Sequence, residues 1–173
     1  TGAAKNLTAS NPAWDTGPAF SADGKTLYYR AMKRPGFEAD RFALMAMDLA
    51  SGSTREIAPQ WDRSADGITL SADGKKIYTT AQELGNHPLF EVTIEDGSVS
   101  QVVGGESVGE FVIEGNTLAV ANNSLKSGNR ILVAQRPEGP GASALREITP
   151  SAAEQLPDVR FGDFEQFNFK GWN

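Results

Sequence analysis

The sequence predicts an all-β protein built from repeats, and two recurring phrases carry this prediction. Residues 20–28 (FSADGKTLY) recur as residues 70–78 (LSADGKKIY), 50 positions later in the chain. In each copy an Asp-Gly pair separates short runs of apolar and aromatic residues, which is a strong local signal for a β-hairpin. A weaker copy follows at 111–120 (FVIEGNTLAV), with Glu-Gly-Asn at the turn. Hairpins that recur at a fixed period indicate a repeat architecture.

The second phrase is a short segment with an apolar third residue, followed by a polar loop. It occurs at 5–8, 55–58, 100–103 and 146–149. One more strand is expected between each hairpin and its closing segment, at 42–49, 89–94 and 130–135. Each unit then holds four strands in about 40 to 50 residues, the period of a β-propeller blade. We therefore predict a partial β-propeller of about three four-stranded antiparallel blades plus flanking strands.

The repeats also predict the domain boundaries. The blades are expected at about 18–58, 68–103 and 111–149, and residues 1–10 as the last strand of a preceding blade. Helical periodicity extends over only one or two turns, near 152–156, within a tail at 151–173 that is predicted to be a linker. Because propellers close with about four to eight blades, three blades predict a larger parent protein.

Composition excludes several classes of function. The net charge is −6 and acidic and basic residues alternate, so no nucleic-acid partner is expected, since such a partner needs a basic surface. No apolar run is long enough to predict a membrane span. The absence of cysteine excludes disulfides, thiol catalysis and cysteine-bound zinc. No cofactor and no metal are expected, because the single histidine, His87, lies in a predicted surface loop without other ligands nearby in sequence.

Two short motifs suggest activities that their surroundings do not support. Residues 105–109 (GESVG) match the Gly-x-Ser-x-Gly nucleophile motif, which needs a strand before it and a helix after it. Here residues 110–113 open another strand, so Ser107 is predicted to lie in a loop between blades and no catalytic residue is expected. The Trp-Asp pairs at 14–15 and 61–62 follow fourth strands, where the tryptophans are predicted to pack between blades.

An insertion at 32–41 (MKRPGFEADR) joins the second and third strands of the first predicted blade. Loops of this kind emerge on the same propeller face as the connections between blades. The charged residues of the insertion are therefore expected to converge with those of the next connection. Two interpretations stay open: a solvated loop with internal ion pairs, each worth little, or a site for a ligand or a second domain. The candidate binding residues are Glu38, Asp40, Arg41, Asp62 and Arg63.

Several segments resemble known propellers. Residues 18–25 (PAFSADGK) and 146–150 (REITP) are similar to the repeat of TolB-like propellers. The insertion at 33–41, together with 59–64 (PQWDRS), resembles the propeller of the dipeptidyl-peptidase and acylaminoacyl-peptidase branch of the prolyl oligopeptidase family. The tail at 165–173 (EQFNFKGWN) is similar to the segment by which those enzymes enter their α/β-hydrolase domain.

In that family the propeller caps the catalytic domain and admits peptides but not folded proteins. The resemblance implies a non-catalytic segment that gates and orients peptide substrates for an α/β-hydrolase domain downstream of residue 173. That domain and the peptide are then its partners, the parent is a periplasmic or secreted serine exopeptidase or oligopeptidase, and this chain alone is inactive. Because a relative holds the substrate amine with acidic propeller residues, Glu38 and Asp40 are nominated by analogy.

An alternative interpretation is a TolB-like propeller that acts as a protein-binding scaffold without an enzyme. The tail favours the peptidase interpretation, because a scaffold has no need of it. In either case a partial propeller exposes the flanks of its end blades. Self-association through these flanks is therefore expected.

Overall fold

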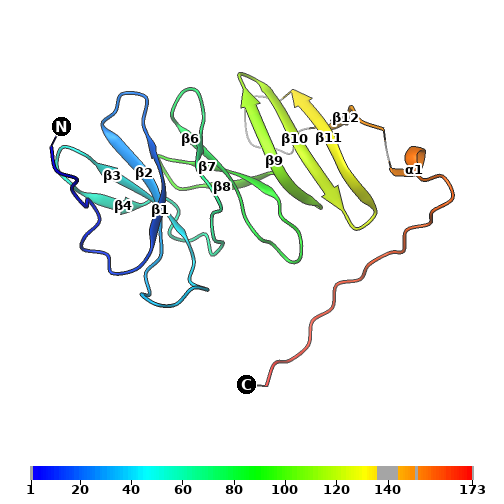
Figure 1. The fold of residues 1–173 in the computed structure, drawn as a ribbon, viewed down its shortest axis with the longest axis horizontal. Coiled ribbons are helices and arrows are strands. Elements are labelled where there is room, and N and C mark those ends of the chain that lie inside the picture. Colours follow the sequence, from blue (N-terminus) through cyan, green and yellow to red (C-terminus); the bar gives the residue numbers. More distant parts are fainter. Residues whose placement is uncertain (1, 136–143, 151, 173) are drawn as a thin grey trace.

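The chain forms three four-stranded antiparallel sheets in a row in a computed structural model that describes residues 2–135, 144–150 and 152–172 (Figure 1). The first sheet contains β1 (Asp15–Phe20), β2 (Thr26–Ala31), β3 (Ala43–Asp48) and β4 (Thr54–Glu56). The second contains β5 (Thr69–Leu70), β6 (Lys76–Thr80), β7 (Leu89–Thr93) and β8 (Val99–Val103). The third contains β9 (Ser107–Glu114), β10 (Thr117–Ser124), β11 (Ser127–Gln135) and β12 (Arg146–Glu147). Neighbouring strands in each sheet are consecutive in sequence, which confirms the predicted all-β, blade-like fold.

The recurring hairpin phrase determines its own turn. Ser21 Oγ donates to Asp23 Oδ1 at 2.7 Å, and the same oxygen accepts the Lys25 amide at 3.1 Å. Gly24 then has a φ of 68° and its counterpart Gly74 a φ of 69°, a left-handed conformation that favours glycine. The second copy repeats both bonds to its own aspartate. The turn chemistry is therefore encoded locally, as the sequence predicts.

Two apolar cores join the sheets. The first joint, between the first and second sheets, includes Tyr28 and Leu44 from one side and Ile77 and Val92 from the other. The second joint, between the second and third sheets, contains Tyr78, Leu89, Val102 and Val103 together with Val108, Leu118, Val120 and Leu132. Each sheet is thus covered on a face by its neighbour, and the second sheet is covered on both faces.

The structure departs from the sequence-based expectations at a few positions. Residues 5–8 form no strand, because no other strand of the described chain lies beside them to share ladder hydrogen bonds. β9 begins at Ser107, earlier than the predicted start of the third blade at 111. Within that blade, residues 136–143 lie outside the described residues. The short helix expected near 152–156 is α1 (Ala152–Gln155).

The loops that matter for function share one side of the row, which we term the insertion face. It carries the β2–β3 insertion, the connections between sheets and the β6–β7 loop. Hydrogen bonds join these loops directly: Arg41 reaches the carbonyl of Trp61, and the His87 amide donates to the carbonyl of Glu106. The hairpin turns at Asp23 and Asp73 lie on the opposite side, because antiparallel strands alternate in direction.

Candidate functional site

The insertion is a loop organised around Asp40. One carboxylate oxygen of Asp40 accepts the backbone amides of Lys33 at 2.7 Å and Arg34 at 2.8 Å. The other accepts Arg34 Nε at 3.1 Å, and the Asp40 side chain is 12% exposed. These hydrogen bonds lower the pKa of Asp40 to about 2. The Arg34 guanidinium also lies 3.8 Å from the centre of the Phe37 ring. Asp40 therefore holds the insertion in one conformation.

Arg41 ties the insertion to the connection between the first and second sheets. Its Nη1 donates to the Trp61 carbonyl at 2.9 Å, and its Nη2 pairs with Glu56 at the end of β4. Lys33 Nζ lies 2.8 Å from the second oxygen of Glu56. Burial alone would raise the pKa of Glu56, but the hydrogen bonds from Lys33 and Arg41 outweigh it and lower the pKa. The carboxylate therefore stays ionised between its two cations.

Asp62 and Arg63 lie one step further along the insertion face. Arg63 pairs with Asp62 through one nitrogen and with Glu83 of the β6–β7 loop through another, at 2.7 Å. The hydrogen bond from Glu83 is the main cause that raises the pKa of Arg63. Beside them is a hollow of about 230 Å³, lined by Trp61, Asp62, Arg63, Glu83, Phe90, Val99 and Gln101. The Trp61 and Phe90 rings meet edge to face with centres 5.2 Å apart. The hollow thus combines an aromatic wall with a charged rim.

Glu38 differs from the other candidates because it is exposed and, within the described residues, has no hydrogen bond or ion pair. The structure brings Arg41 against the segment that carries Asp62 and Arg63. It holds Asp40 inside its own loop, where the Arg41 backbone amide is among the groups that lower its pKa, and no described bond joins Glu38 to the other candidates. Internal ion pairs therefore involve four of the five candidates, and Glu38 is the exception among the described residues.

The sequence reasoning missed Lys33, Glu56 and Glu83, which complete the ion pairs of this face. Glu56 ends a fourth strand and Glu83 lies in a loop between second and third strands. The blade topology sends both positions to the insertion face. That topology was available from the repeat and was the signal that would have found them.

The structure corrects the prediction for His87, because the side chain of this loop residue has hydrogen-bond partners far away in sequence. Its Nδ1 lies 2.8 Å from the Val108 carbonyl and its Nε2 2.5 Å from Asp66 Oδ2, an oxygen that also accepts the Thr80 hydroxyl at 3.1 Å. The His87 carbonyl accepts the Val108 amide at 2.9 Å. His87 therefore fastens the second joint, a role that its isolated position in the sequence did not indicate.

Ser107 opens β9 and is followed by strand, not by a helix. Its backbone pairs with His87 in a parallel bridge. Both ring nitrogens of that histidine are already directed at Asp66 and the Val108 carbonyl, so His87 is not positioned to act as a base on Ser107. Ser107 lacks the surroundings of a catalytic nucleophile.

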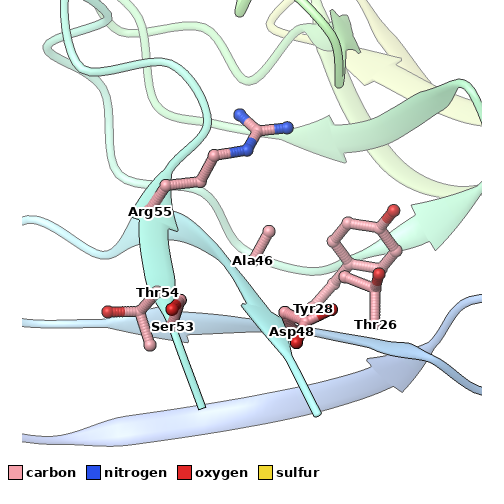
Figure 2. Close-up of a pocket in the computed structure, with 7 residues that line it drawn as sticks. All are labelled: Thr26, Tyr28, Ala46, Asp48, Ser53, Thr54 and Arg55. Atoms are coloured by element: carbon pink, nitrogen blue, oxygen red, sulfur yellow. The ribbon is translucent and has the colours of Figure 1, made fainter. Parts of the chain in front are cut away.

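Another hollow lies on the side opposite the insertion face, and its charged residues have structural roles. It measures about 270 Å³ and Figure 2 shows the residues that line it: Thr26, Tyr28, Ala46, Asp48, Ser53, Thr54 and Arg55. Asp48 accepts the Ser51 amide at 2.7 Å within its own turn, and Arg55 donates to the Ile94 carbonyl of the next sheet at 2.7 Å. The charged groups of this hollow therefore have structural partners.

A larger hollow of about 430 Å³ lies on the insertion face near the third sheet. The β6–β7 loop, the connection at 105–107 and the β10–β11 turn form it, and Phe164, Glu165 and Gln166 of the tail close one side. Lys126 pairs with Asp163 at its edge. Across the described ranges, no group of three or more acidic or histidine side chains is placed to hold a metal ion. None of the helices within those ranges has the length and apolar character to cross a bilayer.

Comparison with known proteins identifies relatives of the chain. No family model matches it. It is 27% identical over 162 residues to dipeptidyl-peptidase 5 of Porphyromonas gingivalis, covering 89% of this chain and 24% of that protein. It is 28% identical over 160 residues to a probable dipeptidyl-peptidase 5 of Aspergillus niger, covering 89% and 21%. A probable dipeptidyl-peptidase 5 of Arthroderma benhamiae is 33% identical over 114 residues, covering 58% and 16%. The chain thus spans a quarter or less of the length of these curated relatives.

Solved structures show the same fold. Puromycin hydrolase superposes with a TM-score of 0.58 at 16% identity, over 79% of this chain and 22% of that one. TolB from Acinetobacter baumannii gives 0.53 at 19% identity, over 78% and 32%. A prolyl endopeptidase gives 0.51 at 15% identity, over 78% and 21%. The resemblance inferred from the sequence is confirmed: the chain is homologous to a segment of proteins named dipeptidyl-peptidase 5, with the fold of the TolB-like and prolyl oligopeptidase propellers.

Proposed function

We propose that this chain is a non-catalytic propeller segment of a serine peptidase that gates and orients peptide substrates for an α/β-hydrolase domain. The observation that carries the proposal is the alignment of 89% of the chain with dipeptidyl-peptidase 5 of Porphyromonas gingivalis. The three sheets support it, because they supply a rigid frame from which loops project toward one face. Peptide substrate and catalytic domain are the partners in this proposal.

Within the site, Glu38 is the group proposed to bind the free amine of the peptide. A carboxylate suits an ammonium group because charge-assisted hydrogen bonds are strong. Glu38 is exposed and has no partner among the described residues. Asp40 was predicted to bind the amine together with Glu38, but both of its carboxylate oxygens already accept hydrogen bonds from Lys33 and Arg34. Its proposed role is therefore to position the loop that presents Glu38.

Arg41, Asp62 and Arg63 are proposed to support this site without contacting the substrate amine. Arg41 anchors the base of the insertion through Glu56 and the Trp61 carbonyl. Arg63 fixes the neighbouring connection to the β6–β7 loop through Glu83. The hollow of about 230 Å³ beside Arg63 is proposed to offer an aromatic wall to a substrate side chain. Rigid loops lower the ordering cost of binding.

The tail supports a catalytic domain on the insertion face. After α1 the described tail has no regular secondary structure, and Lys126 at the β10–β11 turn pairs with Asp163. Phe164 then lines the hollow near the third sheet. Figure 1 shows the tail leaving the third sheet and running back beside the row. A chain that leaves along this face is suited to enter a domain placed over it.

The test uses the full-length protein that contains this segment, with dipeptide substrates whose N-terminus is either free or acetylated. Glu38→Gln removes the charge with little change of shape. We expect kcat/KM on the free-amine substrate to fall about tenfold, or ~1.4 kcal/mol of transition-state stabilisation. Activity on the acetylated substrate should not change, since it carries no ammonium group.

Glu95→Gln is the matched control. Glu95 is also an exposed loop glutamate, but it lies in the β7–β8 turn on the side opposite the insertion face. Equal losses in the two variants, or on the two substrates, would overturn the role of Glu38. Absence of peptidase activity in the unsubstituted full-length protein would overturn the proposed function itself and direct the search to a protein-binding scaffold.

A further inference from the structure

The turn between β6 and β7 holds a leucine in a conformation that leucine disfavours. Glu83 and Asn86 exchange backbone hydrogen bonds of 3.0 and 2.9 Å. Leu84 and Gly85 lie between them with φ angles of 49° and 84°. A two-residue hairpin turn with positive φ at both central positions, as in type I′, normally contains Asn-Gly, Asp-Gly or Gly-Gly. In a leucine the left-handed conformation brings Cβ close to the following carbonyl oxygen. Among the described residues, Leu84 is the one non-glycine residue with a positive φ.

Packing does not compensate for this strain. Leu84 is 70% exposed, so its side chain gains little from burial in the described fold. Asparagine reaches the same backbone conformation more easily and would suit an exposed turn. A strained residue that persists without burial points to a functional role, because strain of this kind gathers where a molecule binds.

Leu84 lines the hollow of about 430 Å³ near the third sheet, together with two other exposed apolar side chains. Leu125 of the β10–β11 turn is 75% exposed and Phe164 of the tail is 60% exposed. Each of the three comes from a different segment, and the hollow lies between them. Apolar side chains that converge on a concave surface without burying one another are typical of a binding site.

The uncharged polar residues of the hollow fit a peptide backbone. Asn86, Ser107 and Gln166 line it, and within the described residues their side chains make no hydrogen bond. Amide and hydroxyl groups can both donate and accept, so they can pair with the N–H and C=O groups of an extended peptide. An apolar wall with a few free amide groups is a suitable surface for a peptide side chain and its flanking backbone.

The charges around the hollow favour a cationic ligand. Glu106 shares Arg130 with Glu147, and Lys126 already pairs with an aspartate of the tail. Glu165 also lines the hollow and has no ion pair within the described residues. Carboxylates therefore outnumber cations here. A positive side chain is attracted by this surface, whereas an acidic one is repelled.

We propose that this hollow binds a peptide segment in which a large apolar side chain stands next to a basic one, with Leu84 and Leu125 as the apolar anchors. The basic side chain lies toward Glu106 and Glu165. The fold keeps a leucine at a strained position because that leucine holds the peptide. The inference rests on the proposed function in taking a peptide as the ligand. It adds a second contact for the peptide on the insertion face, separate from Glu38.

Fluorescence polarisation of a dye-labelled Ala-Leu-Lys-Ala peptide with both ends blocked tests the proposal on the 173-residue chain. The blocked peptide has no N-terminal ammonium group, so Glu38 does not contribute. We expect saturable binding that is weakened about tenfold by Leu84→Asn and by Leu125→Asn, since each removes an apolar contact. Leu7→Asn is the matched control, because Leu7 is an exposed leucine outside the hollow. Its variant should bind like the parent chain.

The charge preference is tested with a second peptide, Ala-Leu-Glu-Ala, blocked in the same way. It should bind more weakly than the lysine peptide. Glu165→Gln should reduce the difference between the two peptides, because it removes one of the negative charges that separate them. Equal binding of the two peptides to the parent chain would overturn the charge preference.

Urea denaturation separates binding from folding. Leu84→Asn should move the unfolding midpoint to a higher urea concentration, because asparagine relieves the positive φ. Leu125→Asn makes the same change in the same hollow at a position without positive φ, and its midpoint should not rise. Leu84→Asn is thus expected to be more stable and yet to bind more weakly, which damage to the fold cannot produce.

Failure of this inference is distinguishable from failure of the proposed function. No binding of the lysine peptide to the parent chain, or unchanged binding by Leu84→Asn, would overturn the inference even if the full-length protein is an active peptidase. A midpoint for Leu84→Asn that does not exceed that of Leu125→Asn would overturn the role of strain. Binding that depends on Leu84 in a full-length protein without peptidase activity would overturn the proposed function and support this inference.

Discussion

The two joints of this chain have similar apolar cores but are fastened by different polar groups. In the first joint, arginines donate to backbone carbonyls of the neighbouring sheet or its connection: Arg30 to Ala65, Arg41 to Trp61 and Arg55 to Ile94. In the second joint, His87 bonds to Asp66 and the Val108 carbonyl, and Glu91, buried on the second sheet, binds Lys76 and Tyr78. One repeat therefore yields joints that differ in what disturbs them.

The largest effects should come from one register position in all three sheets. Leu44 and Leu89 are equivalent and fully buried in the two joints, and Ile131 is their half-buried counterpart in the third sheet. Leu44→Ala and Leu89→Ala should each lower the free energy of unfolding by about 2–5 kcal/mol, through lost burial and a cavity. Ile131→Ala should cost less, about 1–2 kcal/mol, because part of its side chain stays in contact with water. Urea denaturation measures all three, and an equal loss at Ile131 would contradict its smaller burial.

The sequence predicted this common framework because it is encoded locally. Residues 21–25 and 71–75 specify the same turn through one serine, one aspartate and one glycine, so the strands on either side could be placed without knowing their neighbours. The candidate site was predictable only as a face. Which carboxylate meets which cation depends on side chains from loops far apart in sequence, and Glu56 and Glu83 were found only once those loops were positioned.

His87 shows more clearly that side-chain pairings between distant loops could not be predicted from the sequence. The carboxylates nearest to it in sequence, Glu83 and Glu91, pair with Arg63 and Lys76, whereas its own partners Asp66 and Val108 each lie 21 positions away. The pairing exists because the connection before β5 and the start of β9 meet at the β6–β7 loop. Long-range polar contacts of this kind follow from tertiary structure and leave no periodic signal in the sequence.

An intermediate effect is expected at the buried carboxylate of the second joint. Glu91 is 6% exposed in its side chain and lies 2.7 Å from Lys76 Nζ. Lys76→Met removes that cation, and a buried carboxylate that loses one of its partners is destabilised, so the free energy of unfolding should fall by about 1–3 kcal/mol. Lys75→Met is the control, because Lys75 is the exposed neighbour in the same turn and should change stability by less than about 0.5 kcal/mol. Equal stability of the two variants in urea would show that the ion pair on the second sheet does not stabilise the fold.

A smaller and more local effect is expected at His87. His87→Gln loses the two ring bonds, at about 1 kcal/mol each at most, but keeps the backbone pairing to Glu106 and Val108. Hydrogen exchange should therefore accelerate in β9, whereas β4 in the first joint should exchange as before. Asn86→Gln serves as the comparison, since it changes the adjacent side chain in the same loop. Faster exchange in both joints would mean that His87 acts on the whole fold and not on the second joint.

The smallest effect is expected from a substitution of Asp40 in the insertion, because Asp40 orders a surface loop and is not part of either apolar core. The pKa of Asp40 is lowered from 3.8 to about 2, so its contribution is complete above about pH 4 and is lost as the pH falls through about 2. At neutral pH, Asp40→Asn should speed trypsin cleavage after Lys33 a few-fold, while Glu38→Gln, in the same loop, should not. In pepsin digests, the ratio of the cleavage rate of Asp40→Asn to that of the parent chain should fall toward one as the pH is lowered from about 4 to about 2. Protonation of Asp40 then removes the same charge from the parent chain. A ratio that stays constant over that range would mean that the charge of Asp40 does not order the loop.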